Sequence, residues 1–380
     1  MKDLITLRDE LDRIDQEIVK LYEERMDVCK EVGSIKIEMK KQVFDKEREE
    51  EKIAKVLELT QNENLKVGVA ELYRQLLTQS RKLQYQIMVK EGITYNHNFQ
   101  AVEKFLRAGK KVVFQGSAGA YSEAATKKFF GDRMEKYHVR SFKEAVQEVV
   151  DKKAAYGVLP IENSSAGAVF DVYDLLSEVD VTIIGEIIIP INHVLAASQG
   201  ASLLTIKEVY SHPQALMQCS DYLGEHKDWE QIKIANTAIA AEKIQKEKNV
   251  KQAAICSREA AKLNNLVILE EQMNKSEDNK TRFVIIAGEK IYQEESDKIS
   301  ICFELPHESG SLYRLLSHII FNGLNMTKIE SRPVRNKSWE YKFFVDFSGN
   351  LREAAVENAL TGLAQESINF KILGNYQVKL

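Results

Sequence analysis

The chain has 380 residues, 44% of them hydrophobic and 29% charged, with a formal net charge of −4 at pH 7. This length is too great for one core of ordinary size and predicts two or three domains of a globular protein. The slightly acidic balance gives no reason to expect nucleic acid or an anionic membrane as a partner. Four widely spaced cysteines argue against a zinc site or a disulfide framework and favour the cytoplasm.

Residues 4–90 have helical periodicity and contain no proline. The pattern predicts a very long helix from Leu4 to about residue 39, a second from Asp45 and a third from about Leu65 to Met88. Arg25 interrupts the apolar stripe of the first helix. Because a cation in a buried stripe needs a partner anion, we interpret this helix as one wall of a ligand pocket. The stripe consists of Leu4, Leu7, Leu11, Ile14, Ile18, Leu21, Val28, Val32, Ile35 and Met39.

Each of the three predicted helices carries two polar side chains on one face. Residues eleven apart on the first helix are separated by about three turns, and residues four apart on the other two by about one turn. Cations, carboxylates and an amide together suit an anionic ligand, whereas a solvated helix face is the ordinary alternative for any one of them. The pairs are Arg25 with Lys36, Asp45 with Glu49, and Ser80 with Gln84.

Arg8 lies seventeen residues before Arg25 and off its face, so we expect it to serve the pocket of a partner chain. A helix of roughly forty residues is about 60 Å long, which is more than a three-helix module can cover with its own atoms. We therefore predict antiparallel self-association of this module. A dimer is then the minimum, and a tetramer is the alternative.

From residue 110 the pattern changes to short β-branched runs that alternate with helices, which predicts an α/β sheet of mostly parallel strands. Polar turns lie near several strand ends, where open α/β sheets bind ligands. Ordinary tight turns are the alternative for each of them. The predicted strands cover 112–114, 156–159, 181–189, 208–210, 253–256 and 283–287, and the turns cover 116–122, 160–167, 211–214 and 279–283.

Residues 298–380 have the pattern of two βαβ halves in the order βαββαβ, which is that of a ferredoxin-like unit. The residues before and after the α/β region, 91–98 and 289–297, are polar and lack periodicity. We therefore predict a helical domain at 1–90, a linker at 91–110, an α/β domain at 111–288 and an α+β domain at 298–380.

The helical module resembles the all-helical chorismate mutases, and every polar pair above matches a position of that family. The rearrangement of chorismate, a dianion, needs a compact conformer and charge stabilisation, and no covalent catalysis. The resemblance implies that Arg25 and Arg8 of the partner subunit bind the carboxylates, with Ser80 assisting. It implies that Lys36 and Gln84 donate to the breaking ether oxygen, and that Asp45 and Glu49 orient the ring hydroxyl.

The stretch from Lys111 to about Gly288 resembles prephenate dehydratase. The resemblance implies two lobes with the substrate between them, at about 111–190 plus 267–288 and at 191–266. It gives Thr281 the place of the proton donor to the leaving hydroxyl, with Glu162 or His212 as possible proton sources, although a structural role for His212 has the greater weight. The implied substrate-binding residues are Glu162, Asn163, Ser164, Ser211, Gln214, Arg282 and Phe283.

The C-terminal unit resembles an ACT domain of the kind that senses phenylalanine, although many dehydratases have Ala where Ser311 stands. A dimerising sheet without a ligand is the alternative. If phenylalanine binds, it can act on a distant cleft only by favouring one arrangement of that cleft. The implied effector-binding residues are Gly310, Ser311, Leu312, Asn325, Glu330 and Ser331.

Together these resemblances predict a cytoplasmic bifunctional enzyme of phenylalanine synthesis with three domain types, all-α, two-lobed α/β and α+β. It is expected to use chorismate and prephenate, to respond to phenylalanine, and to need no metal or other cofactor. The alternative is a regulatory binding protein that has lost catalysis. Whether the dehydratase site prefers arogenate to prephenate stays open.

Overall fold

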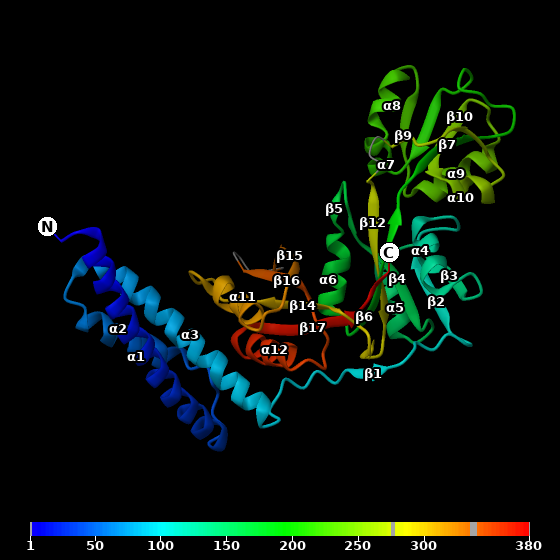
Figure 1. The fold of residues 1–380 in the computed structure, drawn as a ribbon. Helices are drawn as coiled ribbons and strands as arrows, with labels where there is room; N and C mark the ends of the chain where they lie inside the picture. The colour runs from blue at the N-terminus through cyan, green and yellow to red at the C-terminus, as the bar shows by residue number, and fades with distance from the viewer. Residues whose placement is uncertain (1, 275–277, 335–339, 380) are drawn as a thin grey trace. The chain divides into compact units, whose positions relative to one another are not determined.

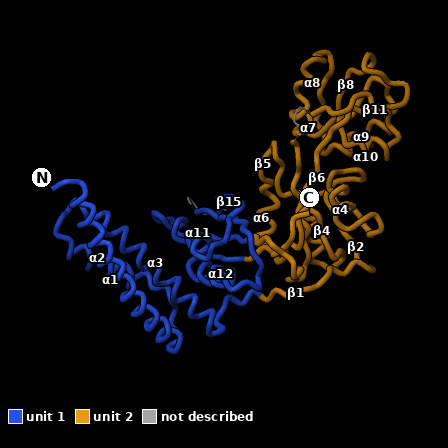
Figure 2. The backbone as a smooth tube through the Cα atoms, in the orientation of Figure 1, with its two compact units in different colours: residues 1–97, 301–371 blue, residues 98–300, 372–380 orange. Residues whose placement is uncertain are grey.

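The computed structural model describes residues 2–274, 278–334 and 340–379. The chain divides into two compact units, which Figure 2 shows in different colours: residues 1–97 with 301–371, and residues 98–300 with 372–380. The predicted helical and C-terminal domains thus share one compact unit. In the described part of the chain, no helix has both the length and the apolar character needed to cross a bilayer.

Three helices form the N-terminal part of the first unit (Figure 1), close to the predicted ranges: α1 (Leu4–Glu38), α2 (Lys46–Leu59) and α3 (Lys66–Lys90). The Asp3 side chain caps α1 by accepting from the N–H of Thr6, and the Asp45 side chain caps α2 by accepting from the N–H of Arg48. Asp45 therefore lies just before the second helix. A short 3-10 turn, η1 (Glu63–Leu65), leads into α3.

The apolar stripe of α1 is largely exposed in the single chain. Only Met26 and Gly33 of this helix are buried, whereas Leu11 and Ile18 are 58% and 57% exposed. Gly33 permits a close approach to α3, since a Cβ built there would lie 2.9 Å from Cγ of Gln84. The module therefore leaves most of the α1 stripe uncovered by its own atoms.

The C-terminal elements follow the predicted order: β14 (Lys298–Glu304), α11 (Ser311–Phe321), β15 (Met326–Pro333), β16 (Tyr341–Ser348), α12 (Ala354–Glu366) and β17 (Ile368–Tyr376). Their strands are arranged β15-β16-β14-β17, which places β15 at an edge. Helix α12 packs against α3 within the same unit. The buried face of α12, including Val356 and Leu360, fits an apolar stripe turned toward its neighbours.

In the second unit, one sheet has the strand order β6-β12-β4-β2-β3. The strands are β2 (Lys111–Gln115), β3 (Glu135–Val139), β4 (Tyr156–Asn163), β6 (Thr182–Pro190) and β12 (Lys280–Ala287). Strand β2 is parallel to β3 and β4, but β12 runs antiparallel to both β4 and β6. The prediction of a mostly parallel sheet is therefore wrong. Two short strands join the sheet, β5 (Gly167–Ala168) beside β4 and β18 (Val378–Lys379) beside β6.

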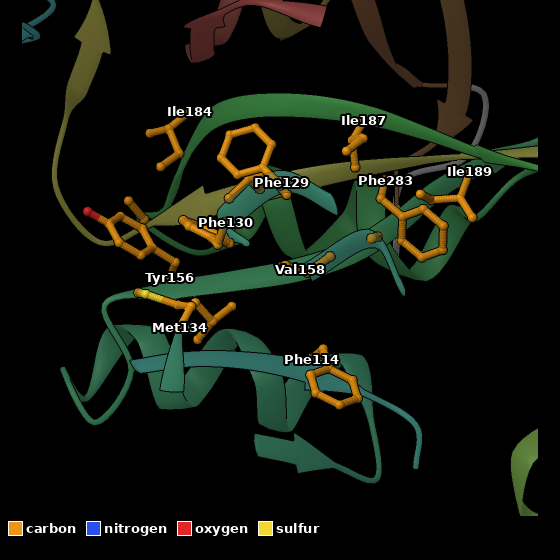
Figure 3. Packing of buried hydrophobic residues seen from close by; sticks show 14 of the residues in the cluster. Phe114, Phe129, Phe130, Met134, Tyr156, Val158, Ile184, Ile187, Ile189 and Phe283 are labelled. Atoms are coloured by element: carbon orange, nitrogen blue, oxygen red, sulfur yellow. The ribbon is translucent and has the colours of Figure 1, made fainter. Parts of the chain in front are cut away.

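Helices α4 (Tyr121–Phe130), α5 (Phe142–Val150) and α6 (Phe170–Glu178) accompany this first sheet. Figure 3 shows the core of this lobe, where aromatic side chains of α4 lie against the strands. The rings of Phe130 and Tyr156 are stacked with centroids 5.1 Å apart. This packing sets the position of α4, whose first turn borders the cavity described below.

The second sheet of this unit has the order β11-β7-β10-β8-β9. Its strands are β7 (His193–Ala197), β8 (Glu208–Ser211), β9 (Glu230–Lys233), β10 (Gln252–Ser257) and β11 (Val267–Glu270), with helices α7 (Pro213–Gln218), α8 (Ser220–Glu225), α9 (Thr237–Glu247) and α10 (Arg258–Leu263). Because β11 pairs with β7, the placement of residues 267–270 in the first lobe was wrong. The chain returns to the first lobe only at β12.

The predicted linker is partly ordered. Strand β1 (Gln100–Val102) pairs in parallel with β13 (Ile291–Gln293), which joins the predicted linker to the segment 289–297 that was expected to lack periodicity. A three-residue strand is too short to show a periodic pattern in the sequence. The second unit therefore extends beyond the predicted range of 111–288 at both ends.

Candidate active sites

The first candidate site lies between α1 and α3, where Arg25 meets Ser80. The guanidinium Nη1 donates to Ser80 Oγ at 2.6 Å and approaches the carbonyl oxygen of Leu76 at 3.4 Å. These contacts satisfy only part of the five-donor guanidinium. Arg25 is half-buried, and its exposed fraction leaves room for an anion.

Lys36 lies three turns further along α1 and donates from Nζ to the carbonyl oxygen of Val43 at 2.6 Å. Burial lowers the pKa of its ammonium, while the charges of Asp45 and Glu49 raise it in part. Both carboxylates therefore lie near enough for their charges to act on Lys36. The sequence spacing alone indicated this only for residues on the same helix.

Gln84 on α3 is buried beneath this region, against Gly33. No group in the described part of the chain donates a hydrogen bond to its Oε1 atom. An unpartnered amide oxygen costs about 1–3 kcal/mol when buried. Since the oxygen and nitrogen of an amide are distinguished only through their partners, one end of this amide is open in the sense that no described residue forms a hydrogen bond with it.

Two other predicted residues have different surroundings. The Glu49 carboxylate accepts two hydrogen bonds from Nη1 of Arg81, at 2.5 and 2.6 Å. Arg8 is exposed and lies about 26 Å from Arg25 along the axis of α1. Arg25, Lys36, Ser80 and Gln84 are thus brought to one side of the module, and Arg8 is not.

The second candidate site is a cavity of about 360 Å³ in the second unit. Both lobes contribute to it, through residues at strand ends and at the first turns of helices. Of the predicted substrate-binding and catalytic residues, Thr281, Asn163, Gln214 and Phe283 line it. The other lining residues are Tyr121, Ser122, Phe142, Pro160, Val169, Ile191, His193, His212, Ala215, Gln218, Asn236 and Thr237.

Asn163 and Thr281 are partners across β4 and β12. The amide Nδ2 of Asn163 donates to Thr281 Oγ1 at 2.9 Å and also to Oδ1 of Asn279 at 2.9 Å. Because Asn163 uses the acceptor side of the hydroxyl, the hydroxyl proton of Thr281 is directed to another acceptor. This arrangement makes Thr281 a positioned donor at the cavity wall.

The cavity lining contains no lysine or arginine among its described residues. Instead, the first turns of three helices border it, at Tyr121 of α4, Phe142 of α5 and Thr237 of α9. The N–H groups of a first helical turn lack intrahelical acceptors and carry the positive end of the helix dipole. Helix N-termini therefore supply the means of binding an anion here.

Four of the predicted substrate-binding residues lie outside this lining. Glu162 and Arg282 pair with one another, with Nε and Oε2 3.4 Å apart, on the face of the two strands opposite to Asn163 and Thr281. Ser211 is fully buried and donates to the carbonyl oxygen of Ile255 at 2.6 Å. Ser164 Oγ donates to the carbonyl oxygen of Asp278 at 2.8 Å.

Three residues that the sequence reasoning missed connect the two lobes at the cavity. The hydroxyl of Tyr121 is 3.1 Å from Nδ1 of His193, and Nε2 of His193 is 3.1 Å from Oε1 of Gln218. Burial lowers the pKa of His193 to about 4, and the hydrogen bond with Gln218 only partly opposes it. His193 is therefore neutral at pH 7. Burial also lowers the pKa of His212.

Gly119 in the turn before α4 lies at a close approach of the two lobes. It has a φ of +83°, and a Cβ built on it would lie 2.6 Å from Cα of Ala260 at the start of α10. Its carbonyl oxygen accepts from Oγ of Ser257 at 2.7 Å. The polar turn predicted at 116–122 thus packs the lobes together.

The predicted effector residues lie at two places in the C-terminal elements. Gly310, Ser311 and Leu312 form the start of α11, where Gly310 has a φ of +74°. Asn325 directly precedes β15, and Glu330 and Ser331 lie on that edge strand, where Ser331 is exposed.

The chain matches two protein families, chorismate mutase type II over residues 7–85 and prephenate dehydratase over residues 112–291. Two solved structures are similar over the larger part of the chain, each with a TM-score of 0.65 and 28% identity. A prephenate dehydratase from Arthrobacter aurescens in complex with L-Phe covers 70% of this chain and is itself 89% covered. A quorum-quenching acylase covers 71% of this chain and is itself 98% covered.

A relative that matches along its whole length distinguishes a mutase and dehydratase from an acylase. The bifunctional chorismate mutase/prephenate dehydratase of Aquifex aeolicus is 35% identical over 384 residues, which cover 99% of this chain and 98% of that protein. These matches confirm the resemblances to chorismate mutase and to prephenate dehydratase that were inferred from the sequence. The chain belongs to the family of bifunctional chorismate mutases/prephenate dehydratases.

Proposed function

We propose that this chain converts chorismate to prephenate in the helical module and prephenate to phenylpyruvate in the two-lobed cavity, under feedback inhibition by phenylalanine. The observation that carries the proposal is the gathering of Arg25, Lys36 and the open Gln84 amide beside α1 and α3. The test supplies the purified chain with chorismate alone. Phenylpyruvate is the expected product, whereas accumulation of prephenate would leave the cavity without its proposed activity.

In the mutase reaction, Arg25 and Arg8 of the partner subunit bind the two carboxylates of chorismate. Lys36 and Gln84 donate to the ether oxygen, on which negative charge grows as the carbon–oxygen bond breaks. Asp45 and Glu49 orient the ring hydroxyl. All of these groups act by positioning and by electrostatics, since the rearrangement forms and breaks its bonds within one molecule.

In the dehydratase reaction, Thr281 donates a hydrogen bond to the ring hydroxyl, which takes up a proton and leaves as water. The bond from the ring to its carboxylate breaks at the same time, releasing CO₂, and its electron pair completes the aromatic ring. A threonine hydroxyl is too weak an acid to supply the proton on its own, so Thr281 relays a proton taken from water in the cavity. The N-termini of α4, α5 and α9 hold the substrate carboxylates. Arogenate in place of prephenate tests the preference of the site.

The exposed stripe of α1 is proposed to contact a second copy of the chain. We expect Ile18→Glu to lower the oligomeric mass and to reduce mutase activity at least tenfold, because the pocket loses Arg8 of the partner subunit. Light scattering after gel filtration measures the mass. Val67→Glu, at an 82% exposed position on α3, is the matched control and should change neither quantity. An unchanged mass for Ile18→Glu would contradict the proposed interface.

Phenylalanine is proposed to bind at the start of α11 and along β15, as in an ACT domain. We expect Ser331→Arg to raise the phenylalanine concentration for half-inhibition of the dehydratase at least tenfold without changing the uninhibited rate. The bulky cation would occupy the exposed face of β15 where the effector binds. Thr327→Arg, which is also exposed on β15, is the control. If phenylalanine half-inhibited Ser331→Arg and Thr327→Arg at the same concentration, the effector would have to bind elsewhere.

A further inference from the structure

A buried arginine on α3 joins the proposed mutase site to the C-terminal elements of the same unit. Arg81 is 3% exposed, and its guanidinium meets two carboxylates. Nη1 donates to both oxygens of Glu49, at 2.5 and 2.6 Å, while Nε and Nη2 donate to the two oxygens of Glu366, at 2.8 and 3.2 Å. Its face lies over the ring of Phe44, 4.9 Å from the centroid.

The charges around Arg81 keep one another in the charged form, although the groups are buried. Burial acts to lower the pKa of Arg81, but Glu366 and Glu49 outweigh it and raise that pKa. Burial acts to raise the pKa of Glu366, but His318 and Arg81 outweigh it and lower that pKa. Nε2 of His318 is 3.1 Å from Oε1 of Glu366. Removing one partner of such a group leaves a buried charge, which is strongly destabilising.

Arg81 fixes the Glu49 carboxylate through a short, charge-assisted contact. Glu49 is carried by α2, a helix of fourteen residues in which only Val56 is buried, so packing alone does little to set its side chain. The charge of Glu49 raises the pKa of Lys36, and the charge of Arg81 lowers it. The position and field of Glu49 at the mutase site therefore depend on Arg81.

Arg81 in turn depends on α12. The two hydrogen bonds that Arg81 donates to Glu366 set the plane of the guanidinium, and that plane determines which edge faces Glu49. Glu49, Arg81 and Glu366 also border a cavity of about 450 Å³, to which Ser311 and Arg314 of α11 contribute. The ion pairs thus have open space beside them on the side of the C-terminal elements.

We infer that Arg81 is a positioning residue of the mutase, which holds Glu49 in place while Glu366 of α12 holds Arg81. The inference rests on the proposed role of Glu49. It predicts that mutase activity responds to changes in α12, although no residue of α12 belongs to the proposed mutase site. If Arg81 only held two parts of the chain together, its replacement would lower stability, and its effect on mutase activity would not depend on the presence of Glu49.

A double-mutant cycle on the full-length chain tests the inference. We expect Arg81→Met to lower the mutase kcat about tenfold to a hundredfold, with the dehydratase rate unchanged. In the Glu49→Gln background the same substitution should lower kcat by less than about twofold more, because the carboxylate that Arg81 positions is already gone. Glu366→Gln should lower the mutase kcat about threefold to tenfold, and Glu366→Asp should restore part of the loss.

Arg74→Met is the matched control, since Arg74 lies two turns before Arg81, borders the same cavity and pairs only with Glu71 of its own helix, at 3.7 Å, among the ion pairs of the described residues. It should leave the mutase rate unchanged. Where Arg81→Met fails to fold, Arg81→Lys enters the cycle, because it keeps the charge and loses the two-sided geometry. Losses that multiply in the double mutant, or a fall in Tm without a fall in kcat, would overturn the inference. A wild-type chain that leaves chorismate unchanged would instead contradict the proposed function.

Discussion

Replacing Lys36 with methionine is expected to lower the mutase kcat about 10²–10³-fold, as is typical when one donor to a developing oxyanion is removed. Methionine keeps the length and the apolar part of the side chain, so the helix should retain its packing. The loss should fall on kcat more than on KM, because charge grows on the ether oxygen only in the transition state. The dehydratase rate of the same sample serves as the internal measure of folding.

The pH dependence of mutase activity is a second, independent test of the role of Lys36. Burial lowers the pKa of its ammonium from the ordinary 10.5, and only the charged form can stabilise negative charge on the ether oxygen. Mutase activity should therefore fall as the pH rises through a value below 10.5, and Lys36→Met should lack this alkaline decrease. Lys30→Met, at an exposed position of α1 paired with Asp27, should keep the wild-type profile. If Lys36→Met retained both rate and profile, another group would have to be the donor.

Replacing Thr281 with valine is expected to lower the dehydratase kcat about 10²–10⁴-fold, which is the range for loss of a positioned proton-transfer group. Valine has nearly the same shape as threonine. Asn163 keeps Oδ1 of Asn279 and the carbonyl oxygen of Lys280 as acceptors, at 2.9 and 3.1 Å. The fold should therefore survive, and the rate of prephenate formation from chorismate should stay at the wild-type value.

Thr281→Ser is the control for this experiment, because it restores the hydroxyl without the methyl group. It should recover most of the dehydratase rate. A Thr281→Val variant with wild-type turnover of prephenate would show that the hydroxyl is not the donor. A variant with a raised KM and an unchanged kcat would make Thr281 a substrate-binding residue only.

Local features of the sequence predicted the three helices of the N-terminal module well. The capped starts of α1 and α2 and the three- and four-residue spacing fix the helices to within a few residues, and on such helices Arg25 and Lys36 necessarily share a face. The meeting of Arg25 with Ser80, 55 residues later, followed from the family resemblance and agrees with the 2.6 Å contact. The exposure of the α1 stripe agrees with the expectation that one module cannot cover it.

Features that depend on long-range pairing were not predicted. The antiparallel pairing of β12 with β4 puts Thr281 beside Asn163. Because successive residues of a strand point to opposite faces, Arg282 has different surroundings from its neighbour Thr281. Arg81 has an ordinary place on a helix, and its partner Glu366 is 285 residues away. His193 has no local pattern that distinguishes it, because its partners Tyr121 and Gln218 come from other elements.

Gly119 has a consequence for how the cavity opens. Between the lobes, polar contacts at this end include that of Ser257 with the Gly119 carbonyl and that of Gln218 with Oγ of Ser165, at 2.7 and 2.6 Å. Each such hydrogen bond contributes only about 0.5–1.5 kcal/mol, since water replaces it on separation. These two hydrogen bonds therefore add little to the free energy that holds the lobes together. Residue 119 sets how far the lobes can close, because any side chain there would meet the backbone of α10 first.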